Sequence, residues 1–313
     1  SGGSGGGGDG GGRVADGGAG TTAAGGGGPA GTGTAGVAAA GVATRSRRPK
    51  VELHVHLDGA FDEDMLWDIA KKRVDDLPEN TLLPWDPTTP WPVKGPVKLC
   101  TQQDDRAQFH SLICCKGQRS LNAMIQCFEI FFPLVRGREE VIEEMAYRFV
   151  RKQASQRVLY TEVRYSPHLL AAGGLMGSDA DAAAAVDPLP VVEAVTAGLR
   201  RGVSEFRVSV NQILCAITWR PEWAESVVEL AHTKRNDFPC AVVGVDIAAG
   251  EAHFNQEAHP ELYAPHNEAF QRAKELKLNI TLHAGAQPLH TRLVVGWATQ
   301  LTSVIGLATL FVP

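Results

Sequence analysis

The chain has 313 residues, enough for one large domain or two small ones, and its formal net charge at pH 7 is −5. Its charged residues are spread along the chain, which argues against a dedicated nucleic-acid surface. The six cysteines include no Cys-x-x-Cys pair and lack the spacing of a disulfide framework, so we expect reduced thiols and a cytoplasmic protein.

The two ends of the chain differ in composition from the middle. Of the 34 glycines, 20 fall in positions 1–41, and such a stretch cannot bury enough apolar surface to offset the entropy of ordering. Residues 1–48 are therefore predicted to be a disordered Gly/Ala-rich leader, before a folded domain at 49–286. Residues 287–313 form a divergent apolar tail, which we interpret as a poor membrane span because Gln300, Ser303 and two glycines interrupt it.

The middle of the chain alternates between two kinds of segment. Short apolar runs rich in Val and Ile predict buried strands at 50–57, 158–166, 207–217, 240–248 and 279–284. Amphipathic patterns predict helices at 61–73, 139–154, 191–206, 223–234 and 265–276. This alternation indicates an α/β fold with parallel strands, either a doubly wound sheet or a barrel.

His54 and His56 lie near the end of the first predicted strand. Residues i and i+2 of a strand point to the same face, so the two imidazoles are expected side by side. Neutral imidazole is a common zinc ligand, and a catalytic zinc site needs three protein ligands and one open position. The alternative is a pair of core histidines bonded to nearby acids such as Glu52 or Asp58.

His283 lies near the end of the last predicted strand. In a barrel the carboxyl ends of all strands meet on one face, so His283 would complete a three-nitrogen site there. Alternatively, it caps its strand by bonding a loop carbonyl. Asp58 either orients a ligand, binds a polar substrate or caps the helix that follows. Glu162 and Arg164 share a strand face, and we expect them to pair with each other.

Four segments occur in an order that resembles a known family: KVELHVHLDGA (50–60), YTEVRYSPHLLA (160–171), VVGVDIAAGE (242–251) and LHAGA (282–286). They are similar to successive strand motifs of the adenosine deaminases, zinc-dependent purine nucleoside deaminases. The resemblance covers roughly residues 49–77 and 119–286. It implies a TIM (β/α)8 barrel of the metal-dependent hydrolase type, incomplete here with about five of its eight strands.

The resemblance also implies roles for the matching residues. His54, His56 and His283 match three ligands of one Zn²⁺, and Asp58 matches an acid that binds the sugar hydroxyls of a purine nucleoside. Other positions match an apolar lid over the purine and a backbone contact to the base. The implied substrate-binding residues are His56, Asp58, Leu121, Met124, Ile125, Phe128, and Ala249 or Gly250.

One position departs from the family pattern in a way that bears on activity. Ala286 stands where the family has a glutamate that protonates the purine ring. A methyl group donates no proton, and loss of a general acid costs about 10²–10⁴-fold in rate. The family's C-terminal motifs are also missing from residues 287–313, so the zinc site is expected to be incomplete. We therefore expect zinc-dependent deamination of adenosine and 2′-deoxyadenosine to be weak or absent. The alternatives are a non-catalytic truncated isoform or pseudoenzyme that binds zinc or nucleoside, and a metal hydrolase with another purine substrate.

Overall fold

The computed structural model describes residues 48–72, 105–114, 121–173, 186–249 and 260–283. Residues 1–47 of the predicted leader, the whole predicted tail, Gly250 and Ala286 lie outside these ranges. No helix in the described part of the chain has the length and hydropathy needed to cross a membrane.

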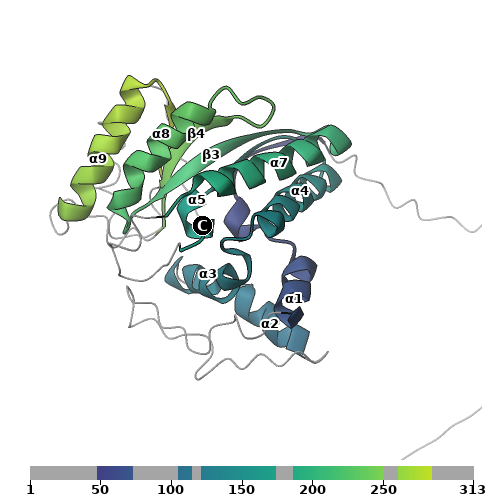
Figure 1. The fold of residues 1–313 in the computed structure, drawn as a ribbon. Coiled ribbons are helices and arrows are strands. Elements are labelled where there is room, and N and C mark those ends of the chain that lie inside the picture. The colour runs from purple at the N-terminus through teal and green to yellow at the C-terminus, as the bar shows by residue number, and fades with distance from the viewer. Residues whose placement is uncertain (1–47, 73–104, 115–120, 174–185, 250–259, 284–313) are drawn as a thin grey trace, which may run out of the picture. The chain divides into compact units, whose positions relative to one another are not determined.

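The described residues form strands and helices in alternation (Figure 1). The strands are β1 (Lys50–His56), β2 (Val158–Tyr165), β3 (Ser209–Ile217), β4 (Val242–Ala248) and β5 (Asn279–Ile280). The α-helices are α1 (Glu63–Lys72), α2 (Asp105–Ile113), α3 (Leu121–Val135), α4 (Glu139–Ser155), α5 (Pro167–Leu170), α7 (Leu189–Phe206), α8 (Ala224–Lys234) and α9 (Pro260–Glu275). Two 3₁₀ turns, η1 (Leu57–Gly59) and η3 (Pro221–Trp223), complete the described elements.

The five strands pair in parallel in the order β1-β2-β3-β4-β5, which is also their order in the sequence. A doubly wound sheet reverses its strand order at a switch point, whereas a barrel wall adds each new strand beside the last. The observed order therefore favours the barrel alternative. β5 is shorter than predicted, but its ladder continues, because the N–H groups of Thr281 and His283 donate to the carbonyls of Val245 and Ile247 (2.9 and 3.2 Å).

The core lies between the sheet and the helices that follow its strands. Val163, Leu214 and Val245 from three neighbouring strands are fully buried, in one hydrophobic cluster with Leu199 of α7 and Val227 of α8. Full burial of such a side chain contributes about 1.5–3 kcal/mol relative to leaving it exposed. This packing fixes the directions in which the strands carry their polar residues.

Helices α4 and α7 approach closely because α7 presents glycines to α4. A Cβ atom at Gly198 would lie 2.1 Å from the carbonyl oxygen of Glu143, and one at Gly202 would lie 2.6 Å from Cβ of Val150. Real Cβ atoms do not come so close to backbone or side-chain atoms, so the contact between these helices depends on the absence of side chains.

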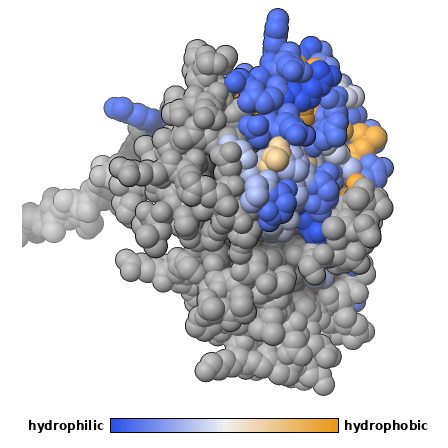
Figure 2. All heavy atoms as spheres, turned by 90° about the vertical axis from the view of Figure 1, so that its left-hand side faces the viewer, coloured by the Kyte–Doolittle hydropathy of each residue, from blue (hydrophilic) through white to orange (hydrophobic). Residues whose placement is uncertain are grey.

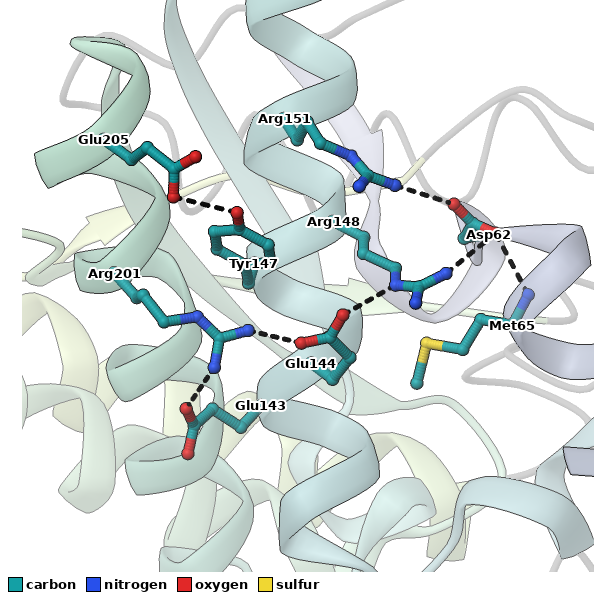
Figure 3. A network of polar contacts seen from close by, with 9 residues as sticks. All are labelled: Asp62, Met65, Glu143, Glu144, Tyr147, Arg148, Arg151, Arg201 and Glu205. Carbon is teal, nitrogen blue, oxygen red and sulfur yellow. Dashed lines mark hydrogen bonds and ion pairs between the residues drawn. The ribbon is translucent and has the colours of Figure 1, made fainter. Parts of the chain in front are cut away.

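A polar network on the surface joins α1, α4 and α7 (Figure 3). Asp62 caps α1, since its Oδ1 accepts a hydrogen bond from the N–H of Met65 (3.0 Å), and Arg148 of α4 lies 3.5 Å from the same oxygen. Arg201 of α7 donates to Glu143 (2.8 Å) and to Glu144 on α4. Because these groups are partly exposed, each pair contributes only about 0–1 kcal/mol.

Exposed apolar side chains lie at the β1 end of the sheet. Val51 and Leu53 of β1 are 62% and 50% exposed, and Leu159 of the paired strand β2 is 56% exposed. Among the described strands, β1 and β5 lie at the two edges of the sheet, and edge strands are templates for further pairing. Figure 2 shows a different face, the left-hand side of Figure 1, where the described residues are mostly hydrophilic with hydrophobic atoms only in small groups.

Candidate metal centre

Three histidine side chains, two from β1 and one from the segment that follows β5, converge at one point. Nε2 of His283 lies 3.1 Å from Nε2 of His54 and 2.9 Å from Nε2 of His56. The ring centroids of His54 and His56 are 5.7 Å apart, as the i, i+2 spacing on β1 predicts. The structure thus brings together the three residues that the sequence predicted as metal ligands, at the carboxyl ends of the strands.

A carboxylate lies close to the opposite ring nitrogen of His283, and another lies farther from that of His56. Nδ1 of His283 lies 2.9 Å from Oδ2 of Asp246, and Nδ1 of His56 lies 3.5 Å from Oδ1 of Asp58. A neutral imidazole carries one N–H, and a carboxylate beside Nδ1 holds the proton there. The lone pair at Nε2 is then free to face the point of convergence.

This donor set fits a tetrahedral zinc ion. With Zn–N distances of about 2.0–2.1 Å, two histidine nitrogens of one site lie about 3.3 Å apart. The observed separations of 2.9 and 3.1 Å differ from that value by only a few tenths of an ångström. Three imidazole nitrogens meeting at one point offer too few protons to satisfy one another by hydrogen bonding, whereas a cation satisfies all three lone pairs.

The lowered pKa of His54 agrees with this role. Burial, assisted by the positive charge of Arg164, lowers the pKa of His54 to about 4, so that His54 is neutral near pH 7 and able to bind a metal. Burial alone would also lower the pKa of His283. The charge of Asp246 and its bond to His283 outweigh burial and raise that pKa above its ordinary value.

Asp246 of β4 is a site residue that the sequence analysis missed. Its side chain is completely buried, and Oδ2 lies 2.7 Å from Nη1 of Arg164 and 2.9 Å from His283. Burial raises the pKa of Asp246, but His283 and Arg164 lower it by more. The net pKa lies below the ordinary value, so the carboxylate stays ionised. The available signal was a single acid within the apolar strand VVGVDIA.

The predicted pairing of Glu162 with Arg164 was wrong. Glu162 accepts a hydrogen bond from the hydroxyl of Tyr160 (2.8 Å), while Arg164 reaches Asp246 and the carbonyl of Leu53 (2.9 Å). Arg164 is only 3% exposed, so its charge requires a buried counter-charge. Asp246 supplies that charge from β4, two strands away. Glu162 lies on the same strand as Arg164, and its carboxylate bonds the hydroxyl of Tyr160 instead.

Asp58 lies in η1, directly after the two histidines of β1. It is 6% exposed, and its Oδ2 accepts a hydrogen bond from the N–H of Ser166 (3.1 Å). The helix-cap alternative is wrong, because Asp62 caps α1. Glu52, the other acid suggested as a partner of the histidines, accepts a hydrogen bond on its carboxylate from the backbone N–H of His54 (3.1 Å).

Helix α3 carries the four residues predicted as an apolar lid. The half-buried ring of Phe128 stacks on Phe132 with centroids 5.2 Å apart. A Cβ atom at Gly59 would lie 3.5 Å from Phe128, so this ring lies against the turn that contains Asp58. Met124, one helical turn earlier, is 44% exposed. The side chains of the other two predicted residues, Leu121 and Ile125, lie outside the described structure.

Ala249 follows the last residue of β4 and has a backbone φ of +91°. This region is unfavourable for residues other than glycine, and strained residues cluster at functional sites. The residue is half-buried and lies two positions after Ile247, whose carbonyl accepts the N–H of His283 (3.2 Å). Ala249 thus lies near the histidines. Its predicted backbone contact to a purine base stays a prediction.

Comparison with known proteins places these features in context. A family model described as adenosine deaminase matches residues 96–291. The chain is 33% identical over 250 residues to adenosine deaminase of Xenopus laevis, covering 76% of this chain and 58% of that protein. It is 32% identical over 250 residues to adenosine deaminase of Rattus norvegicus, covering 76% and 59%. The chain thus spans less than two thirds of the length of these relatives.

Solved structures with a similar fold include the Arabidopsis N6-mAMP deaminase, which is 22% identical to this chain. The match covers 80% of this chain and 62% of the Arabidopsis chain, with a TM-score of 0.55. An amidohydrolase from Burkhoderia ambifaria with bound Zn is 20% identical, covers 81% and 56%, and has a TM-score of 0.53. These similarities concern the fold. With the parallel strand order, they confirm the predicted α/β class, five consecutive strands of a TIM barrel of the amidohydrolase type.

Proposed function

Because the chain belongs to the adenosine deaminase family, we propose that it holds one Zn²⁺ at His54, His56 and His283 and binds a purine nucleoside beside it. The reaction that this site serves is the hydrolytic deamination of adenosine. The observation that carries the proposal is that the Nε2 atoms of His54 and His56 both lie within 3.1 Å of Nε2 of His283, with Asp246 behind His283.

The residues of the site divide the chemical tasks. When bound, the metal supplies Lewis acidity, which activates water as a nucleophile near neutral pH. Asp246, 2.9 Å from Nδ1 of His283, keeps a proton on that nitrogen, so that the Nε2 lone pair of His283 faces the centre. The N–H of Ser166 donates to Oδ2 of Asp58, and Oδ1 of Asp58, which faces His56, is the oxygen that we propose for a sugar hydroxyl.

The apolar contacts to the purine come from α3. Phe128 lies against the turn that holds Asp58, and Met124 on the same helix is exposed and available for contact. An aromatic ring and a thioether suit the flat, polarisable face of a purine, and they exclude water from the site. Ala249, in its strained conformation after β4, offers a backbone group to the base.

Adenosine is the substrate that the relatives favour. The curated relatives that are 32–33% identical are named adenosine deaminases, and they are more similar in sequence than the Arabidopsis protein solved with IMP, which is 22% identical. The latter similarity supports only the fold. A nucleoside monophosphate is therefore the second choice, and calorimetric titration with adenosine and AMP compares the two directly.

Ala286 favours a second function for this chain, the binding of zinc and nucleoside with negligible turnover. The family's proton donor is absent at that position, and its loss costs about 10²–10⁴-fold in rate. In this form of the proposal, the metal centre and the nucleoside site persist while deamination falls to background.

The metal site is tested by metal analysis of the full-length chain after loading with zinc and dialysis. His54→Ala is expected to retain one equivalent of zinc fewer than the parent, because two histidine nitrogens are a poorer site than three. His232→Ala, a change at a histidine of α8, is the matched control and should retain as much as the parent. Equal zinc in His54→Ala and the parent would refute the proposed site.

Turnover is tested by following adenosine absorbance with the zinc-loaded chain, beside the Xenopus laevis relative at equal concentration. We expect the rate of this chain to be at least about 10²-fold lower than the rate of that relative. Equal turnover would show that another residue supplies the proton. Binding is tested separately by calorimetry, in which Asp58→Ala should weaken adenosine binding by about 10-fold or more, since a hydrogen bond to a charged group contributes about 1.5–3 kcal/mol.

A further inference from the structure

We propose a second metal site, for Zn²⁺, formed by Glu63 of α1 and by His110 and Cys114 at the end of α2. Nδ1 of His110 lies 2.7 Å from Oε2 of Glu63 and 3.5 Å from Sγ of Cys114. The three ligand atoms all lie within 4.8 Å of one another. This site shares no residue with the centre formed by His54, His56 and His283.

The local structure brings the three groups together. His110 and Cys114 are four residues apart, a spacing that places two side chains on the same face of a helix. Glu63 is the first residue of α1. The two helices are held together beside the site by Trp67 and the fully buried Phe109, whose ring centroids are 5.5 Å apart. The arrangement of the donors thus rests on packed apolar side chains.

The donor atoms suit zinc. Carboxylate, imidazole and thiolate are the three ligand types of protein zinc sites, and a sulfur donor disfavours Mg²⁺ and Ca²⁺. In a tetrahedral site, a histidine nitrogen and a cysteine sulfur lie about 3.5 Å apart, which is the observed separation. On zinc binding, the distance of 2.7 Å between Nδ1 of His110 and Oε2 of Glu63 must increase by about 0.6–0.8 Å, from a hydrogen bond to the edge of a tetrahedron.

The exposure of the site leaves room for a fourth ligand. The side chains of His110 and Glu63 are 30% and 34% exposed, so water can occupy the remaining position. Metal binding here would join α1 to α2, both of which contact α3, the helix with the proposed purine lid. The site therefore stabilises the helices that contact the proposed lid, and it shares no ligand with the first metal centre.

The ligand sulfur provides a selective signal. The full-length, metal-depleted chain is titrated with Co²⁺ alone, and sulfur-to-cobalt charge-transfer absorption is recorded in the near ultraviolet. The first centre contains only nitrogen donors, so this band reports the second site. We expect the band in the parent and in His54→Ala, its loss in Cys114→Ser and in His110→Ala, and its bleaching by added Zn²⁺, which binds such sites more tightly than Co²⁺.

Cys115→Ser is the matched control, because it removes the neighbouring thiol and keeps Cys114; its band should equal that of the parent. Glu63→Gln, a change on the surface, should shift the titration to higher Co²⁺ concentration. Circular dichroism and thermal midpoints of the metal-free variants identify any variant that fails to fold. Absence of a band in the parent, or its persistence in His110→Ala, would show that the three residues form only a hydrogen-bonded cluster.

Discussion

Replacing Asp246 by asparagine should destabilise the protein more than most changes of similar size. The substitution keeps the shape of the side chain but removes the charge that faces Arg164 at 2.7 Å, where the two side chains are only 0% and 3% exposed. Unit charges about 4 Å apart attract by about 4 kcal/mol at an effective dielectric constant of 20. Removing one partner of a buried pair costs about 3–5 kcal/mol, so we expect a loss of that size in the free energy of unfolding.

Urea unfolding of the metal-free, full-length chain at pH 7, followed by circular dichroism, measures this loss. Neighbouring positive charges hold the pKa of Asp246 below its ordinary value, so its stabilising contribution is fully present at pH 7 and is lost as the pH falls through the folded-state pKa. The double variant Arg164→Met/Asp246→Leu removes both charges and should be near the parent or more stable, by as much as about 1–4 kcal/mol.

Two outcomes would refute this reasoning. If Asp246→Asn unfolds within about 1 kcal/mol of the parent, the buried pair does not stabilise the fold as the geometry implies. If the double variant is as unstable as the single one, the loss comes from packing and not from an uncompensated charge. Zinc affinity gives a second measurement, because loss of the carboxylate behind His283 should weaken it by about 10–100-fold.

Two further predictions concern packing and pH. Gly198→Ala places a methyl group 2.1 Å from the carbonyl of Glu143, and overpacking of this kind costs about 1–3 kcal/mol, so the thermal midpoint should fall by several degrees; an unchanged midpoint would contradict the close contact of α4 and α7. Burial lowers the pKa of His168 to about 4, so on acidification the unfolded chain takes up this proton first and stability falls, by about 1.6 kcal/mol between pH 6.5 and 5. His168→Gln should flatten that part of the pH profile, whereas an unaltered slope would assign it to other groups.

The elements of this fold were largely predictable from the sequence because their signals are local. Runs of Val and Ile and helical periodicity depend on neighbouring residues only, and four of the five strands match within three residues at each end. The predicted boundaries were wrong where contacts between distant segments determine the end of an element. Helix α9 begins at Pro260 and continues through Pro265, where the sequence analysis started it. β5 ends at Ile280, although its backbone bonds continue to His283.

The candidate site was predictable in part. His54 and His56 had to share a face, because the alternation of a strand fixes that relation without reference to other segments. The meeting with His283 required the further assumption that strand ends converge on one side of a parallel sheet, which the fold fulfils. The lid helix was assigned by resemblance alone, and two of its four side chains, Leu121 and Ile125, lie outside the described structure.

The sequence by itself determined that strands alternate with helices, that two histidines lie side by side, and that Ala286 offers no proton to a substrate. Only the tertiary structure decided that Asp246 serves Arg164 and His283 together, and that Glu63 meets His110 across two helices. The physical reason is that charge pairing and ligand geometry depend on distances between segments, which are set by strand register and helix packing. Those distances have no signature in the local order of residues.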